Sequence, residues 1–135
     1  MENMIINHWA VLVSAVFSLA LGALWYSPML FYKGWQKESG VTDEQVKSAN
    51  PAKNYSIAFI LAYIISYNLA FFLGDGATDW KWGLTAGFLA GFGFAATMFA
   101  VIAIFEYRSL KYVLINAGYM IVYLTAVGLI LGAWR

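Results

Sequence analysis

The chain has 135 residues, of which 62% are hydrophobic, 19% are aromatic and 11% are charged. A water-soluble domain carries about a quarter charged residues, and too much of its surface faces solvent to hide this excess of apolar side chains. The net charge of +1 and the lack of cysteine argue against a basic nucleic-acid-binding face, disulfides and thiolate metal sites. We therefore expect the lipid bilayer as a partner and no nucleic acid.

The charged residues leave four long uncharged runs along the chain. A helix needs about 20 apolar residues to cross the hydrocarbon core, whereas the strands of a membrane barrel are runs of about ten with alternating polarity. None of the runs alternates. The sequence predicts an all-α integral membrane four-helix bundle, a single domain over residues 1–135. The expected helices are 4–26, 55–74, 83–105 and 112–134, with a polar loop at 33–53.

The first expected helix, 4–26, differs from a cleaved signal peptide, which has a basic start and an apolar stretch of about 7–15 residues. We expect this helix to be retained and to end at Ser27-Pro28, because the residue before proline disfavours the α conformation. The aromatic segment that follows is expected to lie at the headgroup level. The residues expected at the membrane interface are Trp25, Tyr26, Trp35, Trp82 and Trp134.

The polar loop contains one further element. Thr42 and Gln45 fit a capping box, which predicts a short surface helix that ends near residue 49. A docking helix for a partner and a solvated connector both fit this pattern, and we favour the connector.

The basic residues predict how the chain is oriented. Six lysine or arginine residues lie in 33–53 and 106–111, and the opposite side has only Lys81 and Arg135. Loops rich in these residues stay in the cytoplasm. We therefore expect both loops to be cytoplasmic and both termini to lie outside, in a bacterial inner membrane.

Small residues line one face of the third expected helix, because Gly83, Gly87 and Gly91 are spaced four apart. Glycine permits close backbone approach, on which helix association in lipid depends. The fourth expected helix has a small face that suits the third. Intramolecular packing and a homo-oligomer contact are both open interpretations. The residues expected to make helix contacts are Gly83, Gly87, Gly91, Gly118, Gly128 and Gly132.

The other face of the fourth expected helix is polar, with Asn116, Tyr119 and Tyr123 on one side. Hydroxyl and amide groups inside hydrocarbon need hydrogen-bond partners, and the second expected helix can supply them. We expect these groups to point inward, toward another helix or a small cavity. The candidate ligand face is Tyr63, Tyr67, Asn68, Asn116, Tyr119 and Tyr123.

The sequence lacks the usual signs of catalysis. Ionisable groups at membrane depth mark enzymes and proton-coupled transporters, and none is evident at mid-bilayer. His8 is expected to be an anchor or hydrogen-bonding residue, since a zinc site without cysteine would need several carboxylates. No phosphate-binding glycine loop or activated serine is apparent. We expect no catalytic, cofactor-binding or metal-binding residues.

Several short stretches occur together in an order that resembles a known family. They are Gly22-Ala23-Leu24-Trp25-Tyr26-Ser27-Pro28, Asn50-Pro51-Ala52-Lys53, Arg108-Ser109-Leu110-Lys111, Ile115-Asn116-Ala117-Gly118-Tyr119 and Gly132-Ala133-Trp134. Together they resemble the small bacterial membrane proteins of domain of unknown function 1761. The resemblance covers nearly the whole chain and implies a four-helix membrane protein without an established reaction.

Three functions follow from these features. The leading hypothesis is a non-enzymatic module that acts by helix–helix association, as a homo-oligomer or as an accessory subunit of a membrane complex. The alternative is an oligomeric channel or small-molecule transporter in which Asn68, Asn116, Tyr119 and Tyr123 line polar space. A further alternative is a lipid- or quinone-binding protein or enzyme that uses the aromatic face of the fourth helix.

Overall fold

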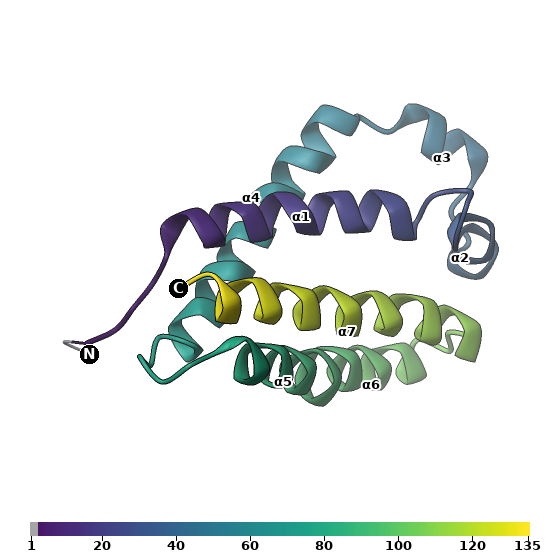
Figure 1. Cartoon of the computed structure of the whole chain (residues 1–135). Helices are drawn as coiled ribbons and strands as arrows, with labels where there is room; N and C mark the ends of the chain where they lie inside the picture. The colour runs from purple at the N-terminus through teal and green to yellow at the C-terminus, as the bar shows by residue number, and fades with distance from the viewer. Residues whose placement is uncertain (1–2) are drawn as a thin grey trace.

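The computed structural model describes residues 3–135, and the regular elements within them are all helices, as the sequence predicted (Figure 1). Within this range, four helical spans are long and apolar enough to cross a bilayer. They are α1 (His8–Trp25), α4 (Pro51–Phe72), the continuous α5–α6 helix (Trp80–Phe105) and α7 (Leu110–Ala133). The short helices α2 (Tyr32–Ser39) and α3 (Asp43–Ser48) follow α1. The chain is a multi-pass helical membrane protein.

The spans begin at polar capping residues rather than at the edges of the uncharged runs. Asn7 starts α1 later than expected, because its side chain accepts from the N–H groups of Trp9 and Ala10 at 3.0 and 3.2 Å. The other three spans begin earlier than expected and place a lysine in or near the first turn. Their caps are Asn50, Asp79 and Ser109. A side-chain cap satisfies an otherwise unpaired N–H, and a lysine stem can reach back to the headgroups.

The predicted surface helix is present as α3. The Thr42 side chain accepts from the Gln45 N–H at 3.2 Å, and the Gln45 side chain accepts from the Thr42 N–H at 2.9 Å. This reciprocal pair is the capping box that the sequence indicated. The preceding helix α2 lies where only an interfacial aromatic segment was expected, and it ends at Gly40 with a left-handed φ of 78°.

Small buried side chains spaced four apart lie on both α1 and α4, which pack against each other. They are Ala10, Ser14 and Ser18 on α1, and Ala62, Ser66 and Ala70 on α4, all buried. Rows of residues four apart form ridges, and two such ridges interlock at an oblique angle of about 50°. Figure 1 shows α4 passing behind α1 obliquely, while α1, α7 and α5–α6 run side by side. The small residues let the two helices approach closely.

The main chains of α5 and α7 touch through glycine. A Cβ built on Gly83 would lie 2.8 Å from the Gly132 Cα, and one built on Gly128 would lie 2.9 Å from the Gly87 Cα. Farther along, a Cβ on Gly91 would lie 2.9 Å from the Ile121 Cα. Any side chain here meets backbone, which cannot rotate away as a side chain can. These glycines are therefore occupied by contacts within one chain.

A π-helical stretch, Gly91–Ala96, joins α5 to α6 within one continuous helix. Thr97 Oγ1 donates to the carbonyls of Gly93 and Phe94 at 2.8 and 3.2 Å. Gly91 faces α7, whereas a Cβ on Gly93 would meet nothing within 4 Å. The wider turn was not expected from the uniform apolar run at 83–105.

The loop between α4 and α5 is held at the end of the bundle opposite α2. The Arg135 guanidinium donates to the carbonyls of Leu73 and Asp75 at 2.7 and 2.8 Å. The Ile5 N–H donates to the Gly74 carbonyl at 2.9 Å. Because the last carbonyls of a helix lack partners within it, the Arg135 contact completes the end of α4.

We predict that Gly87→Ala lowers the free energy of unfolding by about 1–3 kcal/mol, the usual cost of overpacking. The added methyl group meets the main chain of Leu124 and Thr125. Gly93→Ala is the matched control: its methyl group meets nothing within 4 Å, and alanine is the better helix former by about 1 kcal/mol. Unfolding in mixed mild-detergent and SDS micelles, followed by helical circular dichroism, measures both. Equal stability of the two variants would contradict the α5–α7 contact.

Candidate functional site

Aromatic and amide side chains from the end of α1 and from α7 meet in one place, which we call the α1–α7 cluster. It consists of Trp25, Tyr26, Asn116, Tyr119 and Tyr123. The ring centroids of Tyr26 and Tyr119 lie 5.3 Å apart, and those of Tyr119 and Tyr123 lie 5.5 Å apart, both edge to face. This arrangement is favourable for aromatic rings.

Two hydrogen bonds join the end of α1 to α7 within the cluster. The Tyr26 hydroxyl donates to Asn116 Oδ1 at 2.6 Å, and Asn116 Nδ2 donates to the Tyr112 carbonyl at 3.0 Å. The Trp25 indole N–H donates to the Ile115 carbonyl at 3.0 Å. Asn116 is only 8% exposed. Polar groups in hydrocarbon must be satisfied by the protein itself, and here the amide and the phenol satisfy each other.

Two glycines make room for the large rings. The Tyr119 hydroxyl lies 3.0 Å from the position of a Cβ on Gly22, and the Trp25 ring lies 3.0 Å from that of a Cβ on Gly118. Each helix therefore offers a glycine to an aromatic ring of the other. Gly118 was expected on the face that suits the third span, but it contacts the Trp25 ring at the end of α1. An aromatic residue close to each glycine in sequence, Trp25 three positions after Gly22 and Tyr119 directly after Gly118, was the signal for this exchange.

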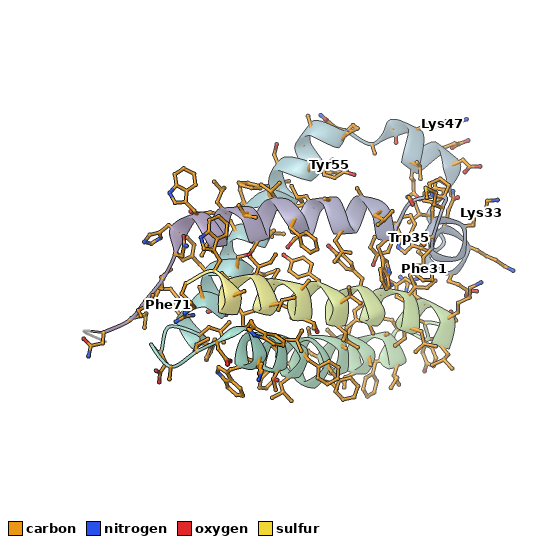
Figure 2. The ribbon with its side chains drawn as sticks, in the orientation of Figure 1. Phe31, Lys33, Trp35, Lys47, Tyr55 and Phe71 are labelled. Atoms are coloured by element: carbon orange, nitrogen blue, oxygen red, sulfur yellow. The ribbon has the colours of Figure 1, made fainter. Side chains whose placement is uncertain are left out.

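The aromatic residues expected at the membrane interface divide into two groups. Trp25, Tyr26 and Trp35 are partly buried, and the rings of Tyr26 and Trp35 lie 5.9 Å apart. Figure 2 shows Trp35 and Phe31 where α2 meets the end of the bundle. Trp82 and Trp134 are exposed. The first group holds α1, α2 and α7 together, and the second faces the surroundings.

The polar residues of α4 do not meet Asn116. The Tyr63 and Tyr67 rings pack 5.0 Å apart, and the Tyr67 hydroxyl forms a hydrogen bond with His8 Nδ1 at the start of α1. Asn68 is exposed, contrary to the expectation that it points inward. The buried face of α4 is Ala62, Ser66, Leu69 and Ala70. Position 68 points away from that face, which explains the error.

Further hydroxyl groups lie in the core without a partner. Within the part of the chain that the structure describes, the buried hydroxyls without a hydrogen bond are those of Ser14, Ser66, Tyr123 and Thr125. Ser14 and Ser66 belong to the ridges between α1 and α4. No group of three or more His, Cys, Asp or Glu side chains within residues 3–135 is placed to hold a metal ion. The core offers hydroxyls, an amide and aromatic surface.

The fold and this core define a class, the small helical membrane proteins with several spans. Residues 9–132 match the model of a family described as a protein of unknown function (DUF1761). The chain belongs to this family, as its sequence motifs indicated. No curated protein and no solved structure matches the chain. Two of the motifs behind the resemblance, 22–28 and 115–119, meet in the α1–α7 cluster, which makes the cluster the best candidate for a shared structural role.

We predict that Tyr26→Phe lowers the free energy of unfolding by about 0.6–1.7 kcal/mol, the range for a hydrogen bond between membrane helices. Tyr107→Phe is the control, because Tyr107 is 95% exposed. Unfolding in mixed micelles measures both variants and Asn116→Leu. If Tyr26 and Asn116 act as a pair, the double variant loses less stability than the sum of the single losses. Strict additivity would contradict the pairing.

Proposed function

We propose that this protein acts by helix–helix association rather than by catalysis, and that its partner is a second copy of the chain. One observation carries the proposal: a stripe of exposed residues runs along α4 with the spacing of a coiled-coil seam. The stripe is Asn54, Ile57, Leu61, Ile64 and Asn68. Their separations of three, four, three and four residues are those of alternating a and d positions.

The first half of α4 is free to receive a partner. Residues 51–61 include no buried residue, and all the buried residues of α4 lie in its second half. Figure 2 shows Tyr55 on the part of α4 that stands away from α1. The glycine faces of α5 and α7, by contrast, already contact each other. We therefore assign association to α4 rather than to the glycines.

Asn68, in the apolar part of the span, favours a second helix over lipid as the neighbour of this stripe. Lipid tails cover isoleucine and leucine as well as a helix does, but they cannot hydrogen-bond an amide. Asn54 and Asn68 occupy equivalent heptad positions, and asparagine there pairs with its own copy in a parallel dimer. A two-fold axis brings the same stripe of each copy together, so each asparagine meets its counterpart.

Cross-linking in native membranes tests this proposal. The chain has no cysteine, so Leu61→Cys introduces a unique thiol on the stripe, where residue 61 is 54% exposed. We expect a covalent product of twice the 15.0 kDa chain. Ile104→Cys, on α6 and 66% exposed, is the control and should stay monomeric.

Asn68→Leu distinguishes a specific dimer from crowding. It should weaken self-association by about threefold to twentyfold, the equivalent of about 0.6–1.7 kcal/mol for an interhelical hydrogen bond. A cross-linked product of another mass would favour the accessory-subunit alternative. No cross-linking of Leu61→Cys beyond that of Ile104→Cys would refute association through α4.

We further propose a bacterial inner-membrane location, with α2, α3 and the α6–α7 turn in the cytoplasm and both termini outside. The six basic residues of 33–53 and 106–111 support this orientation. A membrane-impermeant maleimide on intact spheroplasts should label Ala77→Cys, and should label Ser48→Cys only after permeabilisation. Both positions are exposed, whereas the neighbouring Thr78 is buried. The reverse pattern would invert the proposed topology.

A further inference from the structure

An apolar groove with a lysine at its rim lies at the α2 end of the bundle, next to the α1–α7 cluster and apart from the α4 stripe. Its volume is about 460 Å³, within the size range of small-molecule sites. The turn after α1 contributes Leu30 and Phe31, and α2 contributes Gly34. The start of α7 contributes Lys111, Leu114 and Ile115.

Polar contacts hold α2 against the start of α7 and so shape the groove. The Ser109 hydroxyl donates to Glu38 Oε2 at 2.7 Å, and Arg108 donates to the Ser39 carbonyl at 3.2 Å. Gly34 lets the lysine stem lie across α2, since a Cβ there would come 3.1 Å from the Lys111 Cε. The groove is thus built by contacts between segments far apart in the sequence.

Lys111 supplies positive charge at the rim. The carboxylate of Glu38 already accepts from Ser109, and that of Glu106 pairs with Arg108 at 3.6 Å, the one ion pair among residues 3–135. Lys111 is exposed and lies in the first turn of a membrane span, a position from which a lysine reaches headgroup depth.

We propose that this groove binds an anionic phospholipid, with an acyl chain along the apolar floor and the phosphate on Lys111. The net negative charge and the acyl chain favour this ligand together, because the ammonium group of a zwitterionic lipid offsets the attraction of its phosphate to Lys111. A juxtamembrane lysine attracts anionic lipid, and no side chain caps the α2 N-terminus beside the groove, where the helix dipole also favours an anion.

Native mass spectrometry of the full-length protein in mild detergent tests the site with two added lipids of identical chains, phosphatidylglycerol and phosphatidylcholine. The wild type should retain phosphatidylglycerol preferentially. Lys111→Gln should reduce that retention about fivefold, the effect of one lysine near a membrane surface, and should change phosphatidylcholine retention less. Lys47→Gln is the control, because Lys47 lies on α3 away from the groove (Figure 2).

Gly34→Leu tests the apolar floor separately. The atoms that its side chain meets first are the ends of flexible side chains, Lys111 Cε and Ile115 Cδ1, so the helix can tolerate the change. This variant should reduce the retention of both lipids. Equal retention of the two lipids by the wild type, or unchanged phosphatidylglycerol retention in Lys111→Gln, would overturn the proposal.

Discussion

The helices α5 and α7 contact each other through their main chains rather than through large side chains. Lipid tails are as apolar as leucine, so burying large apolar side chains between two membrane helices gains little free energy. Gly83, Gly128 and Gly132 bring the two backbones together. This contact sets one face of α7. The opposite side of α7 then meets α1 through rings that lie against glycine, as Tyr119 does against Gly22. The helix α7 therefore contacts α5 through its main chain and contacts α1 through rings packed against glycine.

The helix α4 is held in the bundle mainly by its packing against α1. Its buried ridge, Ala62, Ser66 and Ala70, lies in the second half of the helix and crosses α1 obliquely (Figure 1). An oblique crossing keeps two helices in contact over only part of their length, so the first half of α4 separates from the bundle. The stripe from Asn54 to Asn68 is then exposed. The packing within the monomer thus leaves the α4 stripe exposed, and this stripe is the surface through which we propose self-association.

Much of this architecture was predictable because hydrophobic length and capping chemistry are local. The four spans, the capping box of Thr42 and the glycine spacing of α5 all follow from short stretches of sequence. The ridge of Ser14 on α1 carried the same four-residue signal with serine and alanine instead of glycine. The inward placement of Asn68 failed because helix rotation depends on neighbours that the sequence does not specify. The π-helical stretch Gly91–Ala96 depends likewise on tertiary contact.

Solid-state NMR of the protein in lipid bilayers, with ¹³C at the glycine Cα positions, tests the main-chain contact between α5 and α7 most directly. The Cα atoms of Gly83 and Gly132 are close neighbours across the helix pair, as are those of Gly87 and Gly128. We expect cross-peaks for both pairs. Spectra in which Gly83 and Gly87 correlate only with glycines of their own helix would contradict the α5–α7 contact.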